Sequence, residues 1–226
     1  MSDVASGLQV EWLGRVGYAE GLAIQEGALK DRSRGARGDR LLLLEHPPVV
    51  TLGRNTREEN LLLSAEEFAA RGVEVHSVPR GGDVTFHAPG QLVGYLLVDL
   101  EARGQPDLHR FLRGVESALI EALDGLGIGG ASVPGRTGVF VAASTEGGQG
   151  PVRKIASIGF GVRRWVTFHG FALNVSLELS GFDAIVPCGL RDVEMTSVAR
   201  ELGIGPLGLD IRAREAVGAS FRRAFA

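Results

Sequence analysis

The order of strand-like and helix-like stretches is the feature that most constrains the fold of this chain. Residues 40–45 contain an unbroken apolar run typical of a buried strand, and residues 107–123 repeat apolar positions at helical spacing. Residues 64–67 form a capping box, which predicts a short helix ending near Gly72. Further strands are predicted over residues 8–18, 49–52, 73–78, 92–99, 138–142, 154–159, 163–166 and 170–175, and further helices over 19–31, 196–202 and 210–225.

These patterns do not alternate strictly, which favours an α+β fold: a mixed, largely antiparallel sheet flanked by helices. Residues 49–52 are expected to resume the strand of residues 40–45 after His46-Pro47-Pro48. The stretches between residues 138 and 175 are expected to form an antiparallel set with short turns. Because 226 residues suffice for one large domain, we expect a single domain over residues 1–226.

Composition excludes several classes of protein. The net charge of -3 argues against general nucleic-acid binding, which needs a basic face. A single cysteine rules out an intrachain disulfide and fits a reducing compartment. The chain starts without a signal-peptide pattern, and no apolar run approaches the roughly 18 residues of a membrane span. We therefore expect a cytoplasmic protein that binds neither nucleic acid nor membrane.

Cysteine and lysine are the rarest reactive residues in the chain. Cys188 is the one cysteine, and Lys30 and Lys154 are the only lysines against 22 arginines. A lysine that is retained in such a background indicates a need for an amine, because an ammonium can lose its proton and a guanidinium cannot. A thiol and an amine are the two parts of a Cys/Lys acyl-transfer site. The alternative is a buried structural cysteine, and sequence alone leaves contact between Cys188 and Lys154 open.

Two glycine-rich segments have different interpretations. Residues 80–91 combine paired glycines, which let a ligand approach the backbone, with Thr85, His87 and Gln91, which offer hydrogen bonds. This segment is predicted to be either a binding loop or a solvated loop between strands. Residues 125–130 match G-x-G-x-x-G but end a helix instead of opening one, so they predict a turn. His169 is interpreted as structural, with catalysis as the alternative, and the scattered histidines form no zinc ligand set.

Five segments occur in one order along the chain: residues 44–54, 80–91, 154–159, 165–175 and 187–189. Together they resemble the lipoate–protein ligase B family, the octanoyl-[acyl-carrier-protein]–protein N-octanoyltransferases. One departure is Phe140, where the family pattern has tryptophan, although an aromatic ring is kept. The resemblance implies a fold shared with biotin and lipoate ligases and an acyl pocket. It also implies transfer of an octanoyl group from acyl carrier protein to a lysine of a lipoyl domain.

The same resemblance implies roles for particular residues. Cys188 is the acyl-thioester nucleophile, and Lys154 lowers the pKa of that cysteine and is a candidate proton relay. The substrate-binding residues implied are Arg80, Gly81, Gly82, Asp83, Val84, Thr85, Phe86, His87, Ser157, Ile158, Gly159, Gly170, Phe171 and Ala172. No metal, cofactor or ATP is implied. The implied partners of this expected monomer are octanoyl-acyl carrier protein and the lipoyl domains of 2-oxoacid dehydrogenase complexes and glycine cleavage H protein.

Three other functions stay open at this point: an ATP-dependent lipoate or biotin ligase, a non-catalytic module that binds acyl carrier protein or lipoyl domains, and a thioesterase. The backbone N–H groups of Gly81, Gly82 or Gly189 are candidates for an oxyanion hole. Four arginines are interpreted either as a docking patch for acidic partners or as solvated charges at strand ends: Arg153, Arg163, Arg164 and Arg191.

Overall fold

The computed structural model describes residues 7–142, 152–190 and 192–226. Its main sheet has eight strands, ordered β1-β2-β6-β10-β9-β8-β7 with β11 beside β9. The strands are β1 (Gln9–Arg15), β2 (Arg40–Glu45), β6 (Gln91–Leu97), β10 (Val166–Asn174), β9 (Arg153–Arg163), β8 (Val139–Val141), β7 (Gly130–Ala131) and β11 (Glu194–Met195). β1 and β11 pair in parallel with β2 and β9, while the other neighbours are antiparallel. The expected mixed, largely antiparallel sheet is therefore confirmed.

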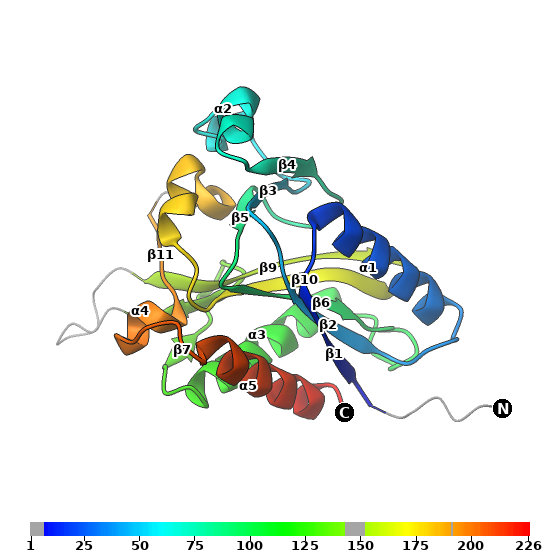
Figure 1. The fold of residues 1–226 in the computed structure, drawn as a ribbon. Coiled ribbons are helices and arrows are strands. Elements are labelled where there is room, and N and C mark those ends of the chain that lie inside the picture. Colours follow the sequence, from blue (N-terminus) through cyan, green and yellow to red (C-terminus); the bar gives the residue numbers. More distant parts are fainter. Residues whose placement is uncertain (1–6, 143–151, 191) are drawn as a thin grey trace.

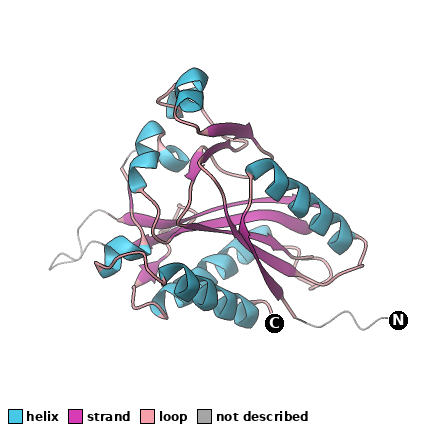
Figure 2. Ribbon diagram, viewed as in Figure 1, coloured by secondary structure: helices cyan, strands magenta, loops and turns pink. Residues whose placement is uncertain are grey.

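A second, smaller sheet lies above one face of the main sheet (Figure 2). It has three strands, β4 (Glu74–Ser77), β3 (Val49–Leu52) and β5 (Thr85–His87). The helices are α1 (Tyr18–Ser33), α2 (Ala65–Ala70), α3 (Leu108–Asp124), α4 (Val198–Leu202) and α5 (Leu209–Ala224). Short 3₁₀ turns complete the described elements: η1 (Glu58–Asn60), η2 (Leu179–Ala184) and η3 (Pro187–Gly189). No helix in the described residues is long and apolar enough to cross a membrane.

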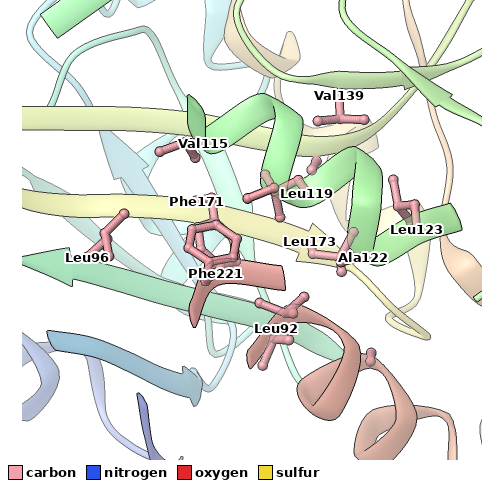
Figure 3. Close-up of a cluster of buried hydrophobic side chains, with 14 of the residues drawn as sticks. Leu92, Leu96, Val115, Leu119, Ala122, Leu123, Val139, Phe171, Leu173 and Phe221 are labelled. Atoms are coloured by element: carbon pink, nitrogen blue, oxygen red, sulfur yellow. The ribbon is translucent and has the colours of Figure 1, made fainter. Parts of the chain in front are cut away.

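The largest core lies between the main sheet and α3 with α5, which cover one face together (Figures 1 and 3). Phe171 of β10 stacks on Phe221 of α5 with ring centroids 4.9 Å apart, and Leu119 of α3 is fully buried beside them. Burying each large apolar side chain stabilises the fold by about 1.5–3 kcal/mol. This packing makes the central strands and α3 a rigid base for side chains on the opposite face.

That opposite face is covered in two parts. α1 packs over β6 and β10, and Val93, Phe168 and Ala172 lie in the apolar cluster beneath it. The small sheet and the η2–η3 segment cover the part of this face that α1 leaves free (Figure 1). The space bounded by α1, the main sheet and the small sheet holds the cavity described below.

Most helices and strands were predicted correctly from local sequence patterns. The predicted helix of residues 107–123 is α3, with Asp107 accepting a hydrogen bond from the Arg110 N–H at 3.0 Å. The capping box at Ser64 and Glu67 is formed and begins α2. The G-x-G-x-x-G segment follows α3 as a turn.

Three strand predictions need correction. Residues 49–52 do not resume β2; they form β3 in the other sheet, since the His46-Pro47-Pro48 turn redirects the chain. Residues 163–166 are not a separate strand, because Arg164 and Trp165 have φ of 50° and 60° and form the turn that joins β9 to β10. The segment of residues 80–91 also contains β5, a strand that was not predicted.

Candidate active site

Cys188 and Lys154 are in direct contact. The Lys154 Nζ lies 3.2 Å from the Cys188 Sγ and also donates a hydrogen bond to the Thr137 carbonyl at 3.1 Å. Lys154 is 2% exposed, and its Nζ lies 5.5 Å from the centroid of the Phe140 ring. The aromatic ring at position 140 is thus a cation–π partner of the amine. An ammonium in this place has donors directed at the sulfur and at one carbonyl.

A β-bulge brings a third side chain to the same sulfur. The Ser157 Oγ lies 3.7 Å from the Cys188 Sγ. Residues three apart on a regular strand point to opposite faces, so Lys154 and Ser157 would not meet one atom. Between β8 and β9 the register shifts, because Val139 pairs with Ala156 while Phe140 pairs with Lys154. The extra residue, Ile155, turns into the core and re-aims Lys154 to the side of Ser157.

Cys188 itself sits on a strained turn. It is the central residue of η3 and has φ 57° and ψ 18°, a left-handed conformation that costs a non-glycine residue of order 1–3 kcal/mol. Its N–H donates to the Val84 carbonyl at 2.9 Å, which ties the turn to the segment before β5. Gly189 follows with φ +69°, and a Cβ there would lie 2.8 Å from the Asp83 carboxylate. The backbone therefore presents the thiol from a fixed, tightly packed turn.

A cavity of about 250 Å³ begins at this contact. This is just below the roughly 300–1,000 Å³ of typical small-molecule pockets. Its floor comes from two strands of the main sheet, through Ser157, Ile158 and Gly159 of β9 and Gly170, Phe171 and Ala172 of β10, whereas Val93 and Tyr95 of β6 belong to its wall. Small residues dominate that floor, which leaves room for a narrow chain between the sheets.

The loop of Arg80-Gly81-Gly82 forms the roof. The buried Arg80 guanidinium donates to the Thr51 carbonyl at 2.7 Å and to the Thr51 Oγ1 at 2.8 Å. The loop lies so close to β9 that a Cβ on Gly159 would be 2.8 Å from the Gly81 carbonyl oxygen. Burial lowers the pKa of Arg80, while the nearby Cys188, Tyr18 and Asp83 raise it. The guanidinium thus adds a fixed positive charge near the thiol.

Five polar rings surround the remaining wall of the cavity: Tyr18, His46, His87, Tyr95 and His169. The His46 Nε2 bonds the Tyr95 hydroxyl at 2.8 Å, and the His87 Nδ1 bonds Gln91 at 2.7 Å. Burial lowers the pKa of His87 to about 3 and that of His169 to about 4, and it raises the pKa of Tyr18 to about 12. These rings are therefore neutral at pH 7.

Three buried polar atoms of cavity-lining residues have no partner among the described residues: the Thr85 Oγ1, the Arg136 Nη1 and the His169 Nε2. His169 is 4% exposed and has φ 59°, and its backbone N–H donates a hydrogen bond to the Gln25 Oε1 of α1 at 2.8 Å. A buried polar group without a hydrogen bond is costly, so all three atoms are suited to contact a bound molecule or water. A cluster of three or more metal-ligating side chains is not found in the described part of the chain.

Comparison with known proteins shows the family of this chain. The lipoyl protein ligase A/B catalytic domain model matches residues 17–221. The chain belongs to this family. An octanoyltransferase of Acidobacterium capsulatum is 49% identical over 196 residues, which is 84% of this chain and 78% of that protein. An octanoyltransferase of Chloroflexus aurantiacus is 46% identical over 208 residues, which is 92% of this chain and 90% of that protein.

The fold agrees with solved ligase structures. A bipartite lipoate protein ligase from Thermoplasma acidophilum, studied with its E2 lipoyl domain, superposes with a TM-score of 0.72 at 15% identity. The match covers 97% of this chain and 84% of that chain. At such identity the likeness shows the fold alone, and it confirms the expected ligase-like arrangement.

In this lipoyl protein ligase A/B domain, most of the predicted substrate-binding residues line the cavity. Three do not: Gly81, whose N–H donates to the Phe160 carbonyl, and Val84 and Phe86, which pack in the core of the small sheet. The residue pattern did not indicate the cavity residues Tyr18, His46, Tyr95 and Arg136, and it favoured a structural role for His169. They come from separate elements, so spacing offered no signal for them.

Two further predictions change with the structure of this family member. Arg153 and Arg163 lie at opposite ends of β9 and pair with Glu201 and Glu26, so they do not form one docking patch. Arg164 lies in the turn that follows Arg163, and Arg191 lies outside the described residues. Of the oxyanion-hole candidates, Gly81 and Gly189 donate their N–H groups to Phe160 and Val186. Gly82 lines the cavity, and no described residue accepts a hydrogen bond from its N–H.

Proposed function

We propose that this protein is an octanoyltransferase that moves an octanoyl group from octanoyl-acyl carrier protein, through a thioester on Cys188, to a lysine of a lipoyl domain. The observation that carries the proposal is the 3.2 Å contact of Lys154 Nζ with Cys188 Sγ at the mouth of a narrow cavity. The choice of octanoyl as the acyl group rests on relatives called octanoyltransferases, which are 46–49% identical over most of the chain.

In the first step the Cys188 thiolate attacks the carbonyl carbon of the donor thioester. The Lys154 ammonium stabilises the thiolate before attack through a charge-assisted contact. A C–S bond to Cys188 forms, and the donor C–S bond breaks. The donor sulfur leaves as a thiol after taking a proton from Lys154. The Gly82 N–H is proposed as an oxyanion donor in this step.

In the second step the neutral amine of the acceptor lysine attacks the Cys188 thioester. A C–N bond forms, the C–S bond breaks, and the proton lost by the amine returns to the neutral Lys154 amine. Cys188 is regenerated as a thiolate beside an ammonium, which closes the cycle without ATP. Each protein substrate occupies the site in turn, so ping-pong kinetics are expected.

The cavity supports a short acyl chain as the transferred group. Ser157, next to the sulfur, pairs with Ala172, and His169 lies three residues further along β10. At about 3.3 Å per residue, the polar rings start ~10 Å from the dyad. Seven single bonds of ~1.5 Å in a zigzag span ~9 Å, so an eight-carbon chain reaches from Cys188 to that wall.

The names of the relatives support a lipoyl-domain acceptor. The Thermoplasma acidophilum ligase was studied together with an E2 lipoyl domain, and we propose that lipoyl domains of 2-oxoacid dehydrogenase complexes and glycine cleavage H protein are acceptors here. We also propose that residues 1–226 form a single catalytic domain that acts as a monomer in the cytoplasm. The identity to octanoyltransferases disfavours the ATP-dependent ligase.

Intact-protein mass spectrometry tests the proposal directly. Wild type and Cys188→Ser are mixed with octanoyl-acyl carrier protein, and a lipoyl domain is then added. We expect an octanoyl adduct on wild type that the lipoyl domain discharges and that is missing from the serine variant. Rapid loss of the adduct to water without acceptor would indicate a thioesterase. Lipoylation that requires ATP and free acid, and that survives Cys188→Ser, would contradict the proposal in favour of a ligase.

A further inference from the structure

Glu116 is a buried carboxylate that the mechanism above does not use. It lies on α3 and is 1% exposed. Its Oε1 accepts a hydrogen bond from the Gly138 N–H at 3.1 Å, and its Oε2 pairs with Arg113. A buried carboxylate is costly unless it is paired and hydrogen-bonded. Its partners therefore connect the rigid core helix to the segment between β7 and β8.

One peptide group connects Glu116 to the catalytic lysine. The Thr137 carbonyl and the Gly138 N–H belong to the same peptide, which is planar and trans, so the two bonds point in opposite directions. The N–H end is held by Glu116, and the carbonyl end accepts from the Lys154 Nζ at 3.1 Å. The carboxylate lies at the N–H end of the peptide dipole, which is partially positive, and the ammonium lies at the carbonyl end, which is partially negative. Both contacts are therefore electrostatically favourable.

Gly138 also touches the stem of the lysine. It has φ +132°, and a Cβ placed on it would lie 2.8 Å from the Lys154 Cε. The same peptide group thus orients the Lys154 head through a carbonyl and limits its stem through close backbone contact. Fixing the Gly138 N–H fixes both contacts.

We propose that Glu116 is a positioning residue that, through the Thr137–Gly138 peptide group, holds the Lys154 ammonium against the Cys188 sulfur. This assignment rests on the proposed roles of Cys188 and Lys154. The groups are arranged as a carboxylate, a peptide dipole, an ammonium and a thiolate, each facing a partner of opposite sign.

The rate of Cys188 alkylation by iodoacetamide at pH 7 measures this arrangement, and the single cysteine makes the signal unambiguous. Glu116→Met removes the acceptor at similar volume, and we expect about tenfold slower alkylation, the usual effect of one hydrogen bond. Glu116→Gln keeps an acceptor oxygen, and we expect it to restore the rate to within about threefold of wild type. In a Lys154→Met background neither change should slow alkylation further.

Leu119→Ala serves as the matched control, since Leu119 is buried on the same helix and faces the core. It should lower the unfolding midpoint at least as much as Glu116→Met and leave the alkylation rate unchanged. Equal slowing by Glu116→Met with and without Lys154, or equal slowing by Leu119→Ala, would overturn the proposal. If Glu116→Met does not fold, Glu116→Ala takes its place: slowing that persists without Lys154, or no slowing when Lys154 is present, overturns the proposal, and slowing that needs Lys154 supports it. Alkylation needs no acyl donor, so this result is independent of whether Cys188 accepts octanoyl.

Discussion

The two ends of the cavity differ in charge: the mouth carries positive charge, and the far wall is neutral. At the mouth, Lys154 and Arg80 place positive charge near the Cys188 thiol. At the far wall, burial keeps His87 and His169 neutral, with pKa values lowered to about 3 and about 4. In the proposed mechanism, chemistry at the mouth needs charge that can stabilise an anion, whereas the wall has to meet an apolar chain.

The difference teaches that polar residues in one cavity need not share a role. Lys154 contacts the sulfur of the proposed nucleophile, while the ring nitrogens of His46 and His87 form hydrogen bonds with Tyr95 and Gln91. Changes at the mouth should therefore alter the rate of chemistry, and changes at the wall should alter stability or acyl affinity. Four predictions test that division.

Lys154→Met gives the largest expected effect. It removes both the charge beside Cys188 and the proton donor, so we expect octanoyl transfer to fall by roughly 10³-fold or more. Lys30→Met is a matched control, because Lys30 is the other lysine and its side chain is 60% exposed. Steady-state transfer with both substrates measures the loss. Full activity of Lys154→Met would end the distinction between the two ends.

Lys154→Arg separates charge from proton transfer. Arginine keeps the positive charge but cannot lose its proton at neutral pH. We expect the octanoyl adduct on Cys188 still to form, because the donor sulfur can leave as a thiolate that takes its proton from water, while its discharge to the lipoyl domain slows by roughly 100-fold, the usual scale of general acid–base catalysis. Single-turnover mass spectrometry resolves the two steps. A variant that discharges at the wild-type rate would exclude the proton relay.

More of the fold than of the site could be predicted from the sequence. Capping residues such as Ser64 and Asp107, together with apolar spacing, act locally, so the helix positions could be predicted. Rarity pointed to Cys188 and Lys154. Their contact depends on a bulge at Ile155 and on the left-handed turn at Cys188, and both are imposed by strands distant in sequence. Backbone groups such as the Thr137 carbonyl carry no residue-type signal at all.

The neutral wall predicts loss of stability in mild acid. The unfolded pKa of histidine is about 6.5, and the folded pKa of His87 and His169 is lowered by burial to about 3 and about 4. The unfolded state therefore binds more protons below pH 6.5, so the stabilising contribution is complete above that pH and is lost as pH falls toward the folded pKa. From pH 7.5 to 5.5 each histidine should cost about 1.4 kcal/mol. Urea unfolding at both pH values measures this, and His169→Gln should remove one histidine's share. An unchanged difference in that variant would mean that His169 is not buried neutral.

Tyr95→Phe gives the smallest expected effect on the rate of transfer and completes the comparison from the side of the wall. The change removes only the hydroxyl that bonds the His46 Nε2 at 2.8 Å, leaving a buried ring nitrogen without that partner. We expect the free energy of unfolding to fall by about 1–3 kcal/mol. The hydroxyl does not contact the dyad, so the discharge rate of a preformed octanoyl adduct should stay within about threefold of wild type. Val93→Ala, a change in the same strand and wall that leaves no polar atom unpaired, controls for altered packing. If Tyr95→Phe slowed discharge as strongly as Lys154→Arg while stability was unchanged, the wall would belong to the chemistry, and the division between the two ends would be wrong.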